Sequence, residues 1–214
     1  MSTRGGGDTM WTDPDLSFEK NLWQGGLQTI VGLDEAGRGA LAGPVAVGAV
    51  SLPNDPHLLS TLSGVRDSKQ MTPLARDAAS VRIKEIAPIH AVGFSSADEI
   101  DSLGIVAATR LAALRALEKI SLIPDYLLTD FRLELPELDI SQTAIVKGDA
   151  RCLSIACASV LAKTTRDALM QELDARHPGY QLGKHKGYGT QAHRLALKRL
   201  GYSSVHRKTF TFKK

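Results

Sequence analysis

The chain has 214 residues, a formal net charge of +3 and a hydrophobic fraction of 43%. This length suits one medium-sized domain, and the composition is that of a globular protein rather than a disordered or fibrous one. No stretch approaches the ~18 consecutive apolar residues of a membrane span, and the polar, glycine-rich N-terminus has no apolar signal segment. We therefore expect a cytoplasmic protein without membrane attachment.

The two cysteines, Cys152 and Cys157, lie in or beside the apolar run from Leu153 to Ala162. Two cysteines do not make a disulfide scaffold. We expect both to be small buried residues of a protein in a reducing compartment.

The modest net charge hides an asymmetry between the two parts of the chain. Residues 150–214 hold 13 Lys and Arg against 3 Asp and Glu, whereas residues 1–149 hold 13 against 20. An acidic body with a basic C-terminal third indicates a carboxylate cluster beside a surface that binds a polyanion. The alternative is that these charges are scattered over solvated faces.

Apolar periodicity and turn residues predict alternating strands and helices after residues 1–12, which we expect to be a disordered tail. In chain order, the expected elements are helix 13–25, strands 29–34 and 44–52, helix 73–87, strand 89–94, helix 97–119, strands 126–130 and 143–146, and helices 152–176 and 190–200. We find no internal repeat or linker, so residues 13–214 are expected to form one domain. Strand pairs interleaved with helices indicate an α/β fold with a mixed five-stranded sheet flanked by helices.

Several helix boundaries have specific sequence signals. Asp13 or Asp15 is expected to cap the first helix. Thr72 is expected to cap the helix at 73–87, with Pro73 at its first position. Gly104 is expected to break the helix at 97–119, and Gly201 to end the last helix.

Carboxylates follow three of the predicted strands: Asp34 and Glu35, then Asp130, then Asp149. Sites in α/β sheets gather beyond the carboxyl ends of strands, and converging carboxylates repel one another unless cations lie between them. Two Mg²⁺ ions ~4 Å apart could be held by such carboxylates. Together they could stabilise an in-line displacement at a phosphoryl group. An isolated strand-end Asp is often only a turn former, which is our interpretation of Asp139.

Neighbouring residues of a strand face opposite ways, so Asp34 and Glu35 are expected to share a site only if the backbone turns there. The Gly37-Arg38-Gly39 piece that follows permits such a turn and offers backbone N–H groups and a guanidinium to phosphate. A dinucleotide-binding fingerprint is disfavoured, because an apolar strand follows these glycines where that motif needs a helix.

At this point the sequence resembles the type 2 ribonucleases H, the ribonuclease HII family of bacterial type. The string from Gly32 to Gly39 is almost the family signature. The resemblance extends over about residues 29–212 through Asp67-Ser68-Lys69, Lys147-Gly148-Asp149, the run 154–167, the run 185–190 and the run 206–210. It implies a ribonuclease H-like fold in which about residues 178–214 form a basic helical segment that binds substrate.

The resemblance also implies roles for individual residues. Asp34, Glu35, Asp130 and Asp149 resemble the four catalytic, metal-binding carboxylates, which hold two Mg²⁺ or Mn²⁺ ions. Gly37, Arg38 and Gly39 resemble the motif that grips the ribonucleotide and reads its 2′-hydroxyl, the group that distinguishes RNA from DNA. Tyr188 resembles the tyrosine that stacks on the next deoxyribose, and Lys69 and Lys186 resemble phosphate contacts.

The activity so implied is endonucleolytic hydrolysis on the 5′ side of a ribonucleotide, in RNA–DNA hybrids or in duplex DNA with embedded ribonucleotides. The products would carry a 3′-hydroxyl and a 5′-phosphate, and the role would be removal of misincorporated ribonucleotides and RNA primers. The expected partner is nucleic acid, and the enzyme is expected to act as a monomer.

The sequence departs from the family pattern at two positions. Phe131 follows Asp130 where the family commonly has glycine, which puts the turn after Asp130 in question. Gly189 replaces a common proline after Tyr188.

Other interpretations remain beside this one. Lys163 and Arg166 could pair with Asp167 or Glu172 as structural ions on one helix. The four histidines of the basic third lack zinc-ligand spacing with cysteines. The rival functions are a junction resolvase or a type 3 ribonuclease H, which carries a large N-terminal domain, and a non-catalytic hybrid-binding module.

Overall fold

The computed structural model describes residues 13–120, 122–131 and 133–211, so the tail expected at residues 1–12 lies outside the described residues. A five-stranded sheet occupies the centre, in the spatial order β3-β2-β1-β4-β5. Its strands are β1 (Ile30–Ala36), β2 (Val45–Ser51), β3 (Ile89–Ser95), β4 (Tyr126–Asp130) and β5 (Gln142–Ile145). Neighbours are antiparallel between β3, β2 and β1, and parallel between β1, β4 and β5. The predicted mixed sheet is confirmed.

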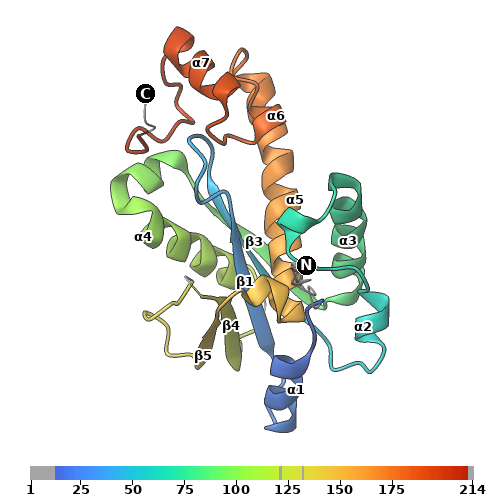
Figure 1. Ribbon diagram of the computed structural model, residues 1–214. Helices are drawn as coiled ribbons and strands as arrows, with labels where there is room; N and C mark the ends of the chain where they lie inside the picture. Colours follow the sequence, from blue (N-terminus) through green and yellow to red (C-terminus); the bar gives the residue numbers. More distant parts are fainter. Residues whose placement is uncertain (1–12, 121, 132, 212–214) are drawn as a thin grey trace, which may run out of the picture.

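Helices cover both faces of the sheet (Figure 1). α4 (Ala97–Glu118) lies on one face, and α5 (Leu153–Arg176) and α3 (Pro73–Ile86) lie on the other. The shorter helices are α1 (Ser17–Gln24), α2 (Leu58–Thr61), η1 (Ser68–Gln70), η2 (Gly148–Ala150), α6 (Leu182–His185) and α7 (Gln191–Leu200). Every long predicted helix is present, whereas the three- and four-residue helices are too short to show a helical period.

Two glycines allow α5 to pack directly on the sheet. A Cβ atom at Gly32 of β1 would lie 2.4 Å from the backbone of Ser154, and one at Gly48 of β2 would lie 2.2 Å from the carbonyl oxygen of Ala158. No side chain fits at these two positions without moving the helix. The close approach fixes α5 against the two strands that lead to and from the Gly37–Gly39 segment.

The helix boundaries largely follow their sequence signals. Thr72 caps α3 by accepting a hydrogen bond from the N–H of Ala75 at 3.2 Å, and Gly104 interrupts α4 with a φ of 78°. The prediction for α1 is wrong in part, because the N-cap is Leu16. Asp15 still serves this end of the helix, since its Oδ1 accepts from the N–H of Ser17 at 2.9 Å.

The N-terminus of α5 has an unusual cap. Cys152 occupies the N-cap position without a side-chain cap, and the carboxylate of Glu19 on α1 accepts instead from the N–H of Ser154 at 2.8 Å. A carboxylate at this end of a helix is favoured by the helix dipole. Cys152 and Cys157 are both free and buried, as predicted.

Two aliphatic cores lie on the two faces of the sheet. Buried residues of α3 and α5 pack with β2 on one face, and buried alanines of α4 pack with β1, β2 and β4 on the other. In the described part of the chain, no helix combines the length and the apolar character that a membrane crossing needs.

Candidate active site

Three acidic side chains meet beyond the carboxyl ends of β1 and β4. Asp34 and Glu35 belong to β1, Asp130 is the last residue of β4, and one carboxylate oxygen from each lies within 4.8 Å of the others. β1, β4 and β5 are parallel, so their carboxyl ends meet at one edge of the sheet. Asp149, in η2 shortly after β5, is close enough for its charge to raise the pKa of Asp34.

The expected backbone turn between Asp34 and Glu35 is wrong. β1 continues in register with β2 as far as Ala36, and the chain turns only at Gly37. The pairing of β1 with β4 ends at Leu33, opposite Thr129, and β4 itself ends one residue later at Asp130, so β4 does not extend beside Glu35. Side chains from opposite faces of β1 can therefore reach the same space beyond the end of β4.

The cluster is electrostatically unfavourable without a counter-ion. Burial and the neighbouring Glu35 carboxylate raise the pKa of Asp34 well above its ordinary value. Burial also raises the pKa of Glu35, and burial together with the Asp67 carboxylate raises the pKa of Asp149 to about 6. Burial alone would lower the pKa of Lys69, but Asp34 and its acidic neighbours raise it.

Asp130 is held by the backbone despite the bulky residue that follows it. Its Oδ1 accepts a hydrogen bond from the N–H of Gly148 at 2.8 Å, and its carbonyl oxygen accepts from the N–H of Leu133 at 2.8 Å. The side chain of Phe131 is 56% exposed. The turn therefore accommodates phenylalanine by pointing it outward, and Asp130 stays in the cluster.

A cleft of about 540 Å³ adjoins the carboxylates. Of the residues named from the sequence, Glu35, Gly37, Arg38, Gly39, Lys69 and Tyr188 line it. Lys186 lies outside this lining, with burial lowering the pKa of its ammonium group. Ser68, Arg76 and Lys163 complete the polar part of the wall.

Two cations face the acidic cluster from different sides. The ammonium group of Lys69 lies 3.9 Å from a carboxylate oxygen of Asp149, and its side chain is 74% exposed. Nη1 of Arg38 lies 3.7 Å from Oε1 of Glu35. This Nη1 is buried and has no hydrogen-bond partner among the described residues. The exposed ammonium group of Lys69 is able to take up an anionic ligand.

Two cations of α5 lie close to the ring of Tyr188. Lys163 and Arg166 lie 5.8 and 5.7 Å from the centre of its ring. The ion pair suggested for Lys163 is present, because its ammonium group lies 2.8 Å from a carboxylate oxygen of Asp167. The carboxylate pairing suggested for Arg166 is wrong, because Arg166 donates to the carbonyl oxygens of Ala42, Pro44 and Lys186.

Sequence reasoning also missed a histidine chain that supports Tyr188. The carbonyl oxygen of Tyr188 can only accept, so Nδ1 of His193, 3.0 Å away, donates. Nε2 of His193 then accepts from Nε2 of His206 at 3.1 Å, and Nδ1 of His206 accepts from the N–H and hydroxyl of Ser203. Both rings are therefore neutral, and each lone pair is used. The four histidines of the basic third were visible in the sequence, but their pairing depends on tertiary contacts.

The carboxylate cluster fits a hard divalent cation. Oδ2 of Asp34 and Oε2 of Glu35 are buried and have no hydrogen-bond partner among the described residues. Unpartnered buried oxygens are costly, and an all-oxygen donor set is what Mg²⁺ and Mn²⁺ prefer. Asp34, Glu35 and Asp130 would supply these oxygens.

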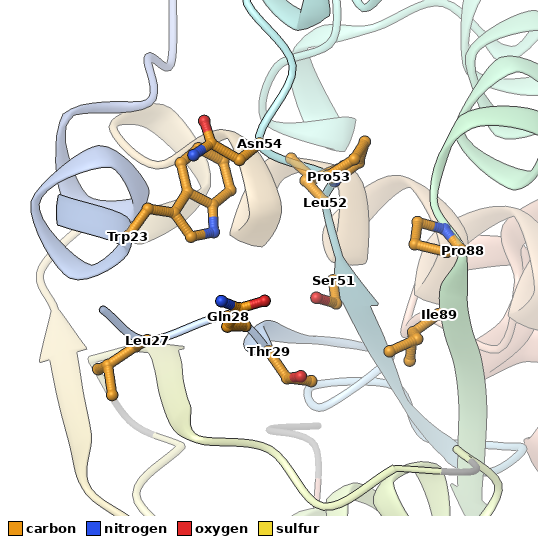
Figure 2. Close-up of a pocket in the computed structure, with 10 residues that line it drawn as sticks. All are labelled: Trp23, Leu27, Gln28, Thr29, Ser51, Leu52, Pro53, Asn54, Pro88 and Ile89. Carbon is orange, nitrogen blue, oxygen red and sulfur yellow. The ribbon is translucent and has the colours of Figure 1, made fainter. Parts of the chain in front are cut away.

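A second pocket lies at the opposite end of β1. Its volume is about 340 Å³. It lies between α1, the segment that leads into β1, the last residue of β2 and the first residue of β3. Figure 2 shows Trp23, Gln28 and Ser51 at this pocket. It holds no charged side chain, so the carboxylate-lined cleft is the stronger candidate for catalysis.

Comparison with known proteins gives a consistent result. The family model described as Ribonuclease HII matches residues 31–213. A ribonuclease HII from Dehalococcoides mccartyi is 50% identical over 198 residues, which cover 92% of each chain.

Solved structures show the same fold at lower identity. The ribonuclease HII of a PCNA complex from Archaeoglobus fulgidus is 23% identical with a TM-score of 0.73, over 87% of this chain and 96% of that one. A Bst ribonuclease HIII in complex with Mn²⁺ is 21% identical with a TM-score of 0.59, over 81% of this chain and 63% of that one. The family match and the sequence relative together establish that the chain belongs to the ribonuclease HII family, whose members are metal-dependent endonucleases that hydrolyse RNA in RNA–DNA hybrids.

Proposed function

We propose that this enzyme hydrolyses the phosphodiester on the 5′ side of a ribonucleotide, in RNA–DNA hybrids and in duplex DNA with embedded ribonucleotides. The products carry a 3′-hydroxyl and a 5′-phosphate. One observation carries the proposal: Glu35 of the acidic cluster lines the same cleft as the Gly37–Gly39 loop and Tyr188. Groups suited to hydrolysis and groups suited to recognising a ribose are therefore immediate neighbours.

Asp34, Glu35, Asp130 and Asp149 are proposed to hold two Mg²⁺ or Mn²⁺ ions. Bound there, divalent cations supply a more acidic water and positive charge for the leaving oxygen. Support comes from the buried, unpartnered oxygens of Asp34 and Glu35 and from the mutual repulsion within the cluster. The Mn²⁺ complex of the structurally similar ribonuclease HIII is consistent with this choice of metal.

The remaining side chains of the cleft are proposed to bind and orient the substrate. Backbone groups of the Gly37–Gly39 loop read the 2′-hydroxyl, while Tyr188 stacks on the sugar of the next deoxynucleotide and also contacts that hydroxyl. Lys69 holds a phosphate beside the carboxylates, and its 74% exposure leaves the ammonium group free to do so. An RNA–DNA junction would satisfy all of these contacts at once.

Residues 178–214 are proposed to be a basic substrate-binding segment of the single domain formed by residues 13–214. Lys186 would contact a backbone phosphate outside the cleft. The last turn of α7 carries Lys198 and Arg199, which add positive charge to the segment. Such contacts strengthen binding without reading sequence. The corresponding biological role is removal of misincorporated ribonucleotides and RNA primers.

The proposal is tested with three duplexes of the same sequence: all DNA, DNA with one ribonucleotide, and an RNA–DNA hybrid. Each is incubated with the full chain in Mg²⁺, in Mn²⁺ and in EDTA, and the ends of the products are identified. We expect metal-dependent cleavage of the two ribonucleotide-containing duplexes, on the 5′ side of a ribonucleotide. Absence of cleavage, or cleavage that leaves a 3′-phosphate, would overturn the proposed reaction.

A further inference from the structure

Two buried arginines lie behind the wall of the cleft. Arg166 on α5 and Arg207 after α7 are both 0% exposed. Neither forms an ion pair with a carboxylate in the described part of the chain. Burying a guanidinium without a counter-ion is costly unless its hydrogen bonds are satisfied, so the partners of these two groups are informative.

Each arginine donates to three backbone carbonyl oxygens. Arg207 donates through Nη2 to Gly37 at 2.8 Å, through Nη1 to Arg38 at 2.8 Å and through Nε to Gly43 at 3.0 Å. Burial lowers the pKa of Arg207 to about 9, so the guanidinium remains charged at neutral pH. The planar fork of an arginine is required to reach carbonyl groups of successive residues in this way.

The contact with Arg207 determines where the N–H groups of the loop point. The chain contains no cis peptide bond among its described residues, and the C=O and N–H of a trans peptide point in opposite directions. Because Arg207 binds the carbonyls of Gly37 and Arg38, the N–H groups of Arg38 and Gly39 point away from it. Within the described residues, neither N–H donates a hydrogen bond.

Arg166 leaves no room for a side chain at Gly37. Gly37 has a φ of +85°, and a Cβ atom there would lie 1.9 Å from Nε of Arg166. Arg166 in turn donates to the carbonyl oxygen of Lys186 at 3.0 Å. The N–H of Leu41 donates to the carbonyl oxygen of Gly187 at 2.8 Å. The loop and the segment that carries Tyr188 are thus fastened to the same buried pair of guanidinium groups.

We propose that Arg207 is a positioning residue for ribonucleotide recognition: it holds the Gly37–Gly39 loop so that the N–H groups of Arg38 and Gly39 face the cleft as donors to the ribonucleotide. The inference rests on the proposed function and extends it to a residue that never touches substrate. The carbonyl of Gly37 also accepts from the N–H of Ala40 at 3.2 Å, so loss of the fork frees mainly the peptide plane between Arg38 and Gly39, and discrimination between ribose and deoxyribose falls. Among the described residues no hydrogen bond or ion pair joins Arg207 to the carboxylate cluster, so we expect metal binding to change little.

The test compares wild type with Arg207→Lys, which keeps the charge and removes the fork. Binding of a duplex with one ribonucleotide and of the matched all-DNA duplex is measured in Ca²⁺, chosen as an ion that supports binding without rapid cleavage. We expect the ribonucleotide preference to fall at least tenfold in the variant, while affinity for all-DNA duplex and for Mn²⁺ changes less than twofold. Leu58→Ala, a buried change on α2, is the control for lost stability and should leave the preference unchanged.

The outcomes separate the inference from the function on which it rests. A wild-type protein without ribonucleotide preference would contradict the proposed function. A folded Arg207→Lys with the wild-type preference would overturn the role of Arg207 alone.

Amide hydrogen exchange on wild type keeps the inference testable if the variant does not fold. The N–H groups of Arg38 and Gly39 should become protected when the ribonucleotide-containing duplex binds and stay less protected with the all-DNA duplex. Equal protection by the two duplexes would overturn the inference.

Discussion

The two sides of the cleft satisfy their polar groups in opposite ways. On the acidic side, buried oxygens of Asp34 and Glu35 lack partners, and burial with like charges raises the pKa of both groups. On the basic side, Arg166 and Arg207 are equally buried, yet each donates to three carbonyl oxygens. The acidic side is incomplete without a ligand, whereas the two buried arginines have their carbonyl partners before any ligand binds.

This difference separates two tasks. Carboxylate oxygens without hydrogen-bond partners inside the protein are available to bind a cation. The same oxygens lower the stability of the fold while no cation is bound. Recognition of a 2′-hydroxyl instead needs donors held in one direction before the substrate arrives, which lowers the entropy lost on binding. The variants below disturb one side while leaving the other intact, beginning with the largest expected effect.

Asp34→Asn should separate activity from stability on the acidic side. Loss of a metal-binding charge is expected to lower kcat by ~10³-fold or more. The free energy of unfolding in EDTA should rise by ~1 kcal/mol, or about 2–4 °C in Tm, because a buried charge that repels its neighbours is gone. Cleavage assays and thermal melts measure the two effects. The exposed Asp139→Asn is the control, and a wild-type rate for Asp34→Asn would contradict the assignment.

Tyr188→Ala should affect recognition without affecting the cations. Stacking on one nucleotide is worth ~1–3 kcal/mol, so the preference for a single ribonucleotide should fall by about 5- to 150-fold. Mn²⁺ affinity, measured by calorimetric titration, should stay within twofold of wild type. Tyr188→Phe separates the ring from the hydroxyl, and an unchanged preference in Tyr188→Ala would refute the assigned role.

The histidine chain should make the basic side sensitive to acid. Burial lowers the pKa of His206 to about 4, against an ordinary value of about 6.5, so the folded state favours the neutral ring. Its contribution is complete above pH 6.5 and is lost as pH falls toward 4, by at most about 1.4 kcal/mol per pH unit, because the unfolded chain takes up the proton first.

Thermal melts between pH 7 and 4 measure this effect. The wild-type Tm should fall more steeply than that of His206→Asn, a comparison that cancels the carboxylates titrating in the same range. His57→Asn, at an exposed position, serves as a matched control and should follow wild type. Parallel curves for wild type and His206→Asn would contradict the neutral chain.

Phe131→Gly should have the smallest effect. The side chain is 56% exposed, and Asp130 is held by backbone hydrogen bonds to Gly148 and Leu133. We expect kcat/KM within twofold of wild type and a stability change within ~0.5 kcal/mol. A tenfold change in kcat/KM, measured with the single-ribonucleotide duplex, would show that this turn controls Asp130.

Much of the fold follows from local sequence signals. The strand ending at Asp130 and the helix beginning after Thr72 have the predicted bounds, because Pro124, Thr72 and Pro73 fix where each element starts. The break at Gly104 is also predicted, since glycine alone adopts its φ of 78° without strain. The carboxylates could be expected to converge once their strands were taken as parallel neighbours.

The rest depends on tertiary contacts that no local pattern carries. Asp34 and Glu35 share a site because β4 ends at Asp130, one residue past the partner of Leu33. The local sequence of either strand does not show where that strand ends relative to its neighbour. Arg166 has an acidic neighbour in sequence, Asp167, yet its guanidinium turns into the protein toward the carbonyl of Pro44. Arg207 and Gly37 are 170 residues apart, so their contact is visible only in the folded chain.

The central claim is that the acidic side is a divalent-metal site completed by Asp130. Its most direct test is an anomalous-scattering map from crystals of the full chain soaked in Mn²⁺. We expect two peaks beside the carboxylates, with an oxygen of Asp130 within about 2.5 Å of one of them. A map without a peak at the cluster, or with peaks that leave Asp130 unligated, would contradict the account.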